Sequence, residues 1–177
     1  MKKENGLTLL EMVFVLVLLS ALIGATVFLY VVSLKSWDEL GRRSETGGEL
    51  HFALERVIRD VRKANAIQIA NHALRFTLNE CSGACTNNSY IYYLYHASDS
   101  WTPTYNQTTY QLRRADLTGG IDGIFTYGAG DLIAPGLKPP SADTTITNTG
   151  NVVKINLVGL DSNETVRVRG FIRPRNV

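Results

Sequence analysis

The carboxylate of Glu11 lies inside a long apolar run, and its position indicates a specific chemistry. The run follows Gly6 and extends through Val32. An ionised carboxylate at the centre of a membrane-spanning helix costs about 2.5–3.5 kcal/mol, so an acidic residue there needs a partner of opposite charge. Cleavage after Gly6 would create a new α-amino group on Leu7, about one helical turn from Glu11. The spacing therefore indicates an acid and an amine at the same depth of a bilayer.

Residues 12–32 form the candidate membrane span. As a helix this segment is roughly 32 Å long, enough to cross a hydrocarbon core of about 30 Å. A secretory signal peptide has a shorter apolar core and a small-residue cleavage site after it, and no Ala-x-Ala site follows Val32. Lys2 and Lys3 precede the span, which predicts a cytoplasmic N-terminus and an extracytoplasmic remainder.

The N-terminus resembles that of type IV pilins and of the pseudopilins of type II secretion. In these proteins a short basic leader ends in Gly, and Glu is the fifth residue of the mature chain. Gly6 matches the last leader residue and Leu7 the first mature residue, where the family more often has Phe. The resemblance implies cleavage between Gly6 and Leu7 by a prepilin peptidase and N-methylation of Leu7. It also implies pairing of Glu11 with the N-terminal amine of a neighbouring subunit.

A plain membrane anchor is the alternative interpretation of the same segment. It explains the apolar run but gives no reason for Gly6 or Glu11. In that case the chain would be a membrane-anchored extracytoplasmic binding or sensor domain with no role in a filament.

Cys81 and Cys85 stand in the sequence Cys-Ser-Gly-Ala-Cys. In an oxidising compartment they can close a small disulfide loop, which would stabilise the fold by about 2 kcal/mol. A zinc site with His72 or His96 is the alternative, but a four-ligand zinc pattern normally has two short paired spacings. The sequence therefore favours a disulfide or free thiols over zinc, and predicts no metal site.

No cofactor is expected, although calcium stays open as an alternative. Asp131, Asp143, Asn148 and Asn151 could supply oxygen ligands. They lack the dense acidic spacing of a calcium-binding loop.

Net charge and motifs exclude other classes of function. The chain carries 18 basic and 16 acidic side chains, a net charge of +2, so no nucleic-acid partner is expected. Gly128-Ala129-Gly130 lacks the rest of a dinucleotide-binding fingerprint, and neither Gly-x-Ser-x-Gly nor His-Glu-x-x-His occurs. We therefore expect a protein that is not an enzyme.

The elements that position these residues follow from the hydrophobic period. An amphipathic helix is predicted to about residue 65, with a buried stripe made of Leu50, Leu54, Val57, Val61 and Ala64. Exposed pairs Glu55–Arg59 and Arg56–Asp60 are expected on its polar face. Glycines at 41, 47 and 48 predict a bend or looser segment there.

After Asn65 the period becomes alternating, which indicates strands with one buried face. The runs are 74–78, 91–95, 110–113, 153–157 and 166–169. Residues 97–109 and 128–151 are interpreted as loops, and 161–163 as a hairpin turn. A helix followed by an antiparallel sheet that covers its apolar face is an α+β architecture. It is also the pilin fold.

Three parts are expected along the chain. Residues 1–6 are a prepilin leader, 7–34 a transmembrane and assembly helix, and 35–177 an extracytoplasmic pilin-like globular domain.

A wider, more diffuse resemblance is to J-type minor pseudopilins and W-type minor pilins. It rests on the helix 52–62, on Leu112-Arg113-Arg114, on 166–169 and on Arg175-Asn176. It implies a minor pilin or pseudopilin that initiates or caps a type IV pilus or a type II secretion pseudopilus. The implied partners are prepilin peptidase, other minor and major subunits, the inner-membrane assembly platform and the lipid bilayer. The implied location is the bacterial inner membrane, and then the filament.

Overall fold

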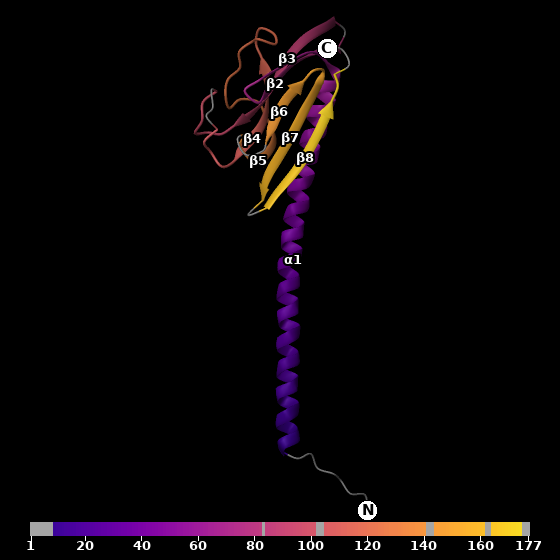
Figure 1. The fold of residues 1–177 in the computed structure, drawn as a ribbon, viewed down its shortest axis with the longest axis vertical. Helices are drawn as coiled ribbons and strands as arrows, with labels where there is room; N and C mark the ends of the chain where they lie inside the picture. The colour runs from indigo at the N-terminus through magenta and orange to yellow at the C-terminus, as the bar shows by residue number, and fades with distance from the viewer. Residues whose placement is uncertain (1–8, 83, 102–104, 141–143, 162–163, 175–177) are drawn as a thin grey trace, which may run out of the picture. The chain divides into compact units, whose positions relative to one another are not determined.

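The computed structural model describes residues 9–82, 84–101, 105–140, 144–161 and 164–174 (Figure 1). The chain divides into two units, Met1–Arg42 and Arg43–Val177. Both draw on the helix α1, which runs from Leu9 to Lys63.

The first unit consists of the N-terminal part of α1. Its apolar segment has a mean hydropathy of 2.8 and is long enough to cross a membrane, and none of that segment is buried within the chain. The hydroxyl of Ser20 donates to the carbonyl of Val17 (2.8 Å), and that of Thr26 donates to the carbonyl of Leu22 (2.7 Å). Because both polar side chains are satisfied inside the helix, they are compatible with a hydrocarbon environment.

In the second unit, α1 forms one side of the core. The predicted stripe is confirmed, since its five members are at most 3% exposed: Leu50, Leu54, Val57, Val61 and Ala64. The looser segment expected at the glycines is wrong, because α1 is helical throughout residues 41–48. A Cβ built at Gly47 would make ordinary van der Waals contact with Val166 at 3.8 Å, so this part of α1 packs against the rest of the second unit, which offsets the weak helix propensity of glycine.

The sheet of the second unit contains eight antiparallel strands among the described residues. They are β1 (Ala64–Ala70), β2 (Ala73–Ser82), β3 (Ala84–Tyr95), β4 (Tyr110–Leu117), β5 (Asp131–Leu137), β6 (Thr145–Thr149), β7 (Val152–Asp161) and β8 (Glu164–Ile172). Their order is β1-β2-β3-β4-β5-β7-β6, with β8 paired to β7. The sheet curls, so that β1 also contacts β6. The α+β architecture and the five predicted strand runs are confirmed.

The loop interpretation of residues 128–151 is wrong in part, because this segment contains β5 and β6. Pro135 and Gly136 interrupt the alternation of β5, and β6 is made mostly of threonine and asparagine. Proline has no backbone N–H, so it cannot donate a hydrogen bond to a neighbouring strand. It is tolerated in β5 because this strand pairs with β7 only at Leu137, and no bond to β7 is needed at Pro135. Strand β1 was also missed. The predicted turn residues 162 and 163 lie outside the described residues.

The sheet is buried on both faces at β3. Tyr92 and Leu94 belong to the main core between α1 and the sheet. Ile91 and Tyr93 belong to a second hydrophobic cluster on the opposite face, where Trp101 and other ring-bearing residues cover them. The expectation of one buried face is therefore wrong for this strand.

Candidate functional site

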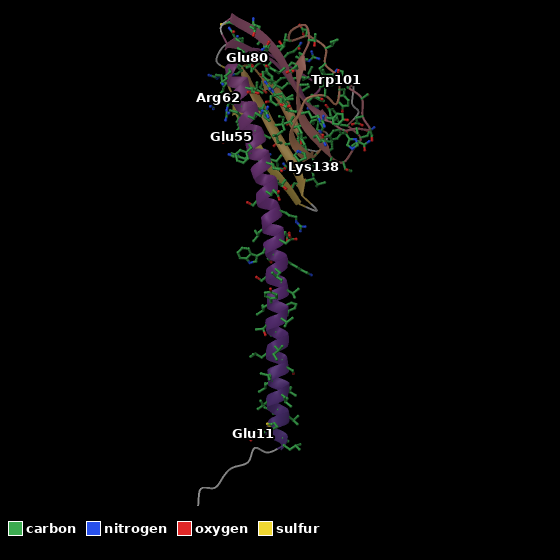
Figure 2. The ribbon with its side chains drawn as sticks, turned by 180° about the vertical axis from the view of Figure 1, so that it is seen from behind. Glu11, Glu55, Arg62, Glu80, Trp101 and Lys138 are labelled. Atoms are coloured by element: carbon green, nitrogen blue, oxygen red, sulfur yellow. The ribbon has the colours of Figure 1, made fainter. Side chains whose placement is uncertain are left out.

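Glu11 lies near the beginning of the described part of α1, in an exposed apolar segment (Figure 2). Its helical neighbours Leu10, Met12 and Phe14 are 80%, 53% and 64% exposed. This surface is made of apolar side chains, so it offers the carboxylate no polar partner. Once the segment lies in hydrocarbon, the carboxylate also loses its hydration, which is unfavourable for a charged group. Gly6 and Leu7, the predicted cleavage and methylation residues, lie outside the described residues.

The charged face of α1 in the second unit does not form the exposed pairs that its spacing predicted. Arg56 donates to Asp131 of β5 at 3.3 Å, and Glu55 lies 3.4 Å from His51 one turn earlier. Asp60 turns toward the sheet. The predicted Arg56–Asp60 and Glu55–Arg59 pairs are therefore wrong. Arg56 and Asp60 each take a partner on the sheet, and Glu55 pairs with the preceding turn of α1 and not with the following one.

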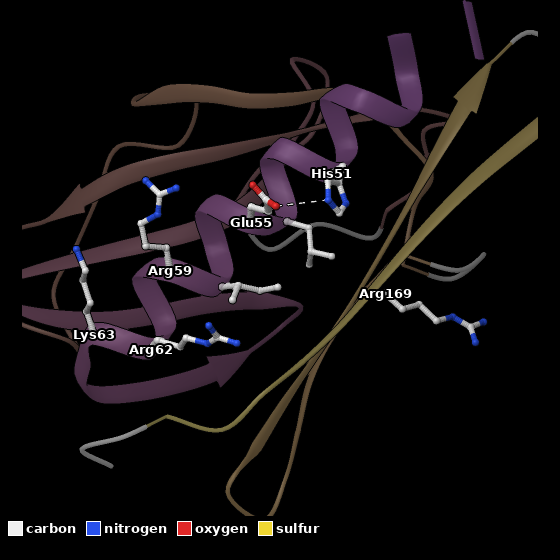
Figure 3. Close-up of a pocket in the computed structure, with 8 residues that line it drawn as sticks. His51, Glu55, Arg59, Arg62, Lys63 and Arg169 are labelled. Carbon is white, nitrogen blue, oxygen red and sulfur yellow. Dashed lines mark ion pairs between the residues drawn. The ribbon is translucent and has the colours of Figure 1, made fainter. Parts of the chain in front are cut away.

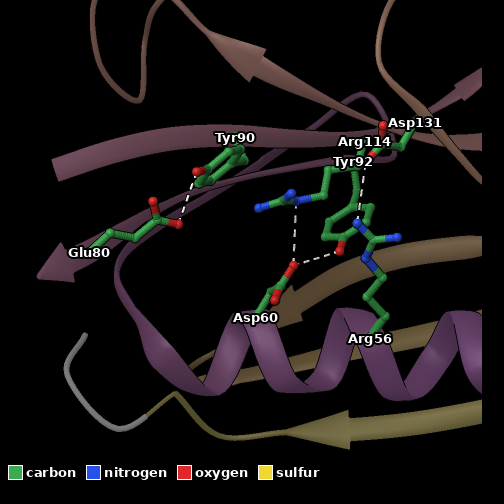
Figure 4. Close-up of polar contacts among 7 residues, drawn as sticks. All are labelled: Arg56, Asp60, Glu80, Tyr90, Tyr92, Arg114 and Asp131. Atoms are coloured by element: carbon green, nitrogen blue, oxygen red, sulfur yellow. Dashed lines mark hydrogen bonds and ion pairs between the residues drawn. The ribbon is translucent and has the colours of Figure 1, made fainter. Parts of the chain in front are cut away.

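Asp60 is the centre of a polar network between α1 and the sheet (Figure 4). The hydroxyl of Tyr92 on β3 donates to Asp60 Oδ2 at 2.7 Å. The Nε of Arg114 on β4 lies 3.5 Å from the same oxygen, and these two side chains are only 18% and 16% exposed. Since Arg114 Nε makes no hydrogen bond within the described part of the chain, its contact with Asp60 is an attraction of charges.

Two tyrosines extend this network across the sheet. The guanidinium carbon of Arg114 lies 3.9 Å from the ring centroid of Tyr90, whose hydroxyl donates to Glu80 at 3.0 Å. Hydrogen bonds from Asn88 and then Tyr90 hold the pKa of Glu80 below its usual value. Burial, followed by the bond to Asp60, raises the pKa of Tyr92. The network thus fixes one face of α1 to three strands.

Cys81 and Cys85 lie directly opposite each other in the register of β2 and β3. Facing residues of an antiparallel pair have Cα atoms about 4.5–5.5 Å apart, which suits a disulfide bridge. Cys85 is disulfide-bonded. The side chain of Cys81 lies outside the described side chains, so the predicted pair fits the backbone register and stays a prediction.

The residues considered as metal ligands are not brought together where the structure describes them. His96 Nδ1 accepts a hydrogen bond from Ser98 N at 3.1 Å, whereas His72 lies edge-on to Tyr105, with ring centroids 5.8 Å apart. Asp131 pairs with Arg56, and Asp143 lies outside the described residues. No group of three or more His, Cys, Asp or Glu side chains suited to a metal occurs in the described part of the chain.

A groove of about 690 Å³ lies between α1 and β8 (Figure 3). Leu54 and Ile58 form its apolar floor, and the cations around it are Arg59, Arg62, Lys63 and Arg169. Sequence reasoning treated these side chains as an ordinary solvated surface. The alternation in 166–169 places Arg167 and Arg169 on the same face of a strand, but no local pattern brings Arg169 near the end of α1.

Comparison with known proteins supports the interpretation of the N-terminus. Residues 1–27 match the family model of the prokaryotic N-terminal methylation motif. Comparisons with curated proteins and with solved structures give no match. The motif marks type IV pilins and pseudopilins, and the long N-terminal helix followed by a curled antiparallel sheet is the pilin-like architecture. The chain therefore carries, over residues 1–27, the N-terminal motif that marks type IV pilins and pseudopilins, on a fold of pilin-like architecture.

Proposed function

We propose that the chain is a minor pilin or pseudopilin that takes part in initiating or capping a type IV pilus or a type II secretion pseudopilus. The observation that carries the proposal is the position of Glu11 among exposed apolar side chains of a helix able to span a membrane. Prepilin peptidase would cleave between Gly6 and Leu7 and leave the Leu7 amine methylated. The N-terminus would face the cytoplasm and the second unit the extracytoplasmic side.

Glu11 would give each subunit its register in the filament. A carboxylate in hydrocarbon costs about 2.5–3.5 kcal/mol, which corresponds to a factor of about 70–400 in an equilibrium constant. A methylated amine remains a cation, so the Leu7 terminus of a neighbouring subunit can recover much of this cost when it lies beside Glu11. Positions one or two residues out of register would separate the two charges and recover less.

The minor role is supported by the position of the cysteines. Major pilins often end in a large loop closed by a disulfide, whereas Cys81 and Cys85 lie early in the sheet and close together. We expect the chain to be substoichiometric in isolated filaments, and to contact other minor and major subunits and the inner-membrane assembly platform.

Intact-mass measurement of the chain from membranes tests the processing step. The mature form should lack residues 1–6 and carry one added methyl group on its N-terminus. A chain that retains residues 1–6 would contradict the proposal and support the membrane-anchored binding or sensor domain.

Glu11→Val tests the assembly step. We expect this variant to insert normally and to be cleaved, but to lose crosslinks to the other subunits and to disappear from the filament fraction. Ser20→Ala is the matched control, because it also removes a polar atom from the apolar segment without removing charge. Normal crosslinking and filament recovery of Glu11→Val would refute a role for the carboxylate.

A further inference from the structure

Strand β8 lies at an edge of the sheet of the second unit. It pairs with β7 over its whole length, from Glu164 to Ile172, without a bulge. No described strand pairs with its other side. Along that side, which we call the β8 edge, the N–H and C=O groups of alternate residues point away from the sheet. Such a row of backbone groups can pair with one further strand.

Helix α1 packs against a face of β8 and not against this edge. A Cβ built at Gly170 would lie 3.0 Å from Leu54 Cδ1 and 3.3 Å from Ile58 Cδ1, so these side chains of α1 lie under the strand. The same two residues form the floor of the groove of about 690 Å³. Arg169 also lines this groove, although its side chain points away from α1 (Figure 3). Because a residue on the outer face of β8 can meet the groove only around the side of the strand, the groove runs along the β8 edge.

The apolar side chains beside the β8 edge are only partly covered. Val166 and Val168 point to the α1 side of the sheet but remain half-buried, and so does Ile58. On the same face of β7, Ile155 and Leu157 are at most 2% exposed. The cover over the inner face of the sheet therefore ends at β8, and a strand added along the edge would bury more of these side chains.

Cations flank the β8 edge. Three of them lie on the α1 side of the groove: Arg59, Arg62 and Lys63. They are exposed, and none has an ion-pair partner among the described residues. On the outer face, Arg169 makes a 3.4 Å hydrogen bond to the neutral side chain of Asn156. The carboxylate in the lining, that of Glu55, is engaged with His51, so the groove carries an excess of positive charge.

Two simpler effects account for part of this charge. Edge strands often carry charged side chains that prevent pairing with another copy, and Arg169 would meet like charges if two β8 strands paired edge to edge. The helix dipole favours Arg62 and Lys63 in the last turn of α1. Neither effect explains why the apolar side chains between these cations stay half-buried. An acidic strand seated along the edge accounts for both the charge and the apolar floor.

We propose that the β8 edge binds an extended acidic segment of a partner protein, which adds to the sheet as a further strand. Side chains of a strand alternate between its two faces. In the added strand, one set is apolar and covers Leu54 and Ile58, and the other set consists of carboxylates beside Arg169. A carboxylate at the end of the segment lies near Arg62. This interaction goes beyond the proposed role in filament assembly and does not depend on it.

Fluorescence anisotropy tests the proposal, with the full chain in detergent and a labelled peptide of alternating glutamate and valine, about ten residues long. In an extended strand the N–H groups of alternate residues point to opposite sides, so the β8 edge can accept hydrogen bonds from only one of the two residue types. Two further peptides carry N-methyl groups, one on its valine amides and the other on its glutamate amides. We expect one of them to bind at least about tenfold more weakly, because several hydrogen bonds are lost, and the other to bind within about twofold of the unmethylated peptide.

Charge reversals test the two sides of the edge. An exposed charge pair is worth up to about fivefold in affinity, and a reversal also adds repulsion, so Arg62→Glu and Arg169→Glu should each weaken binding about fivefold. Lys154→Glu is the matched control, because Lys154 lies on the same outer face but on β7, one strand further from the edge. It should bind within about twofold of the parent chain. All three side chains are exposed, and the thermal transition of each variant shows that it folds.

Several results would overturn the proposal. An absence of saturable binding, or equal affinity of the two N-methylated peptides, would refute the addition of a strand. Equal affinity for a peptide with all its glutamates in one block and its valines in another would show that charge alone is recognised. Equal loss in Lys154→Glu and Arg169→Glu would refute the β8 edge as the site. Because Glu11→Val should bind the peptide as the parent chain does, a failure here is distinguishable from a failure of the assembly proposal.

Discussion

Replacing Asp60 with alanine should destabilise the second unit by about 3 kcal/mol. The substitution removes the acceptor of a 2.7 Å hydrogen bond from Tyr92, whose side chain is fully buried, and leaving such a hydroxyl unsatisfied costs about 1–3 kcal/mol. It also leaves Arg114 as a cation that is only 18% exposed. Breaking a fully buried pair costs about 3–5 kcal/mol, and the residual exposure here lowers that figure.

Thermal unfolding followed by the fluorescence of Trp101 measures this loss. Trp101 packs against Phe125 with ring centroids 4.6 Å apart, so its emission reports the second unit, and Trp37→Phe removes the other indole. We expect a Tm lower by about 9 °C, at roughly 3 °C per kcal/mol for a domain of this size. Glu55→Ala is the control, because its carboxylate is 53% exposed, and it should change stability by less than about 0.5 kcal/mol.

A combined variant tests whether the loss arises from the two partners. When Tyr92→Phe and Arg114→Met are already present, Asp60→Ala should cost only about 1 kcal/mol, because no donor or cation is left without its partner. An unchanged cost of about 3 kcal/mol in that background would refute the network as the cause. A cost below about 1 kcal/mol in the parent chain would do the same.

Three further predictions follow from packing, titration and the cysteines. Gly159→Ala places a Cβ 2.9 Å from Leu50 Cδ1 and should lower the free energy of unfolding by about 1–3 kcal/mol. Gly48→Ala meets nothing within 4 Å and should raise it by up to about 1 kcal/mol, because alanine favours the helix. The midpoints of urea unfolding distinguish the two variants. Burial, followed by the bond to Asp99, raises the pKa of Tyr110 to about 12, above its ordinary value near 10. The free energy of unfolding should therefore keep the full contribution of Tyr110 below pH 10 and lose it as the pH rises toward 12, by up to about 1.4 kcal/mol per pH unit from this tyrosine alone. A flat alkaline unfolding profile would contradict this. If Cys81 and Cys85 form a disulfide, Cys85→Ser should lower the free energy of unfolding by about 2 kcal/mol. Alkylation of the two thiols in the parent chain without prior reduction would rule that disulfide out.

The sequence predicted the elements whose hydrophobic period is regular. The stripe from Leu50 to Ala64 and the alternation in β7 and β8 are each explained by one buried face, so pattern alone located them. The N-terminal motif was equally accessible, because leader, glycine and acidic residue are contiguous in the chain.

What the sequence could not predict depends on contacts between distant segments. Strand β5 contains Pro135 and is held by β4 and by one residue of β7, which no local pattern reveals. Asp60 looked like half of an exposed helical pair until Tyr92 and Arg114 were brought to it from the sheet. The cationic groove likewise joins the end of α1 to β8, about a hundred residues later.

The second hydrophobic cluster restricts how the outer surface of this domain can change. Trp101, Phe125 and Tyr127 come from connecting segments, yet they cover Tyr93 and Ile91 as core residues would. The hydroxyl of Tyr93 also donates to the carbonyl of Ala129 at 2.6 Å. Substitutions and insertions in these connections should therefore be tolerated only where they leave the three rings in place. A change that moved one of the rings would expose the second hydrophobic cluster to water.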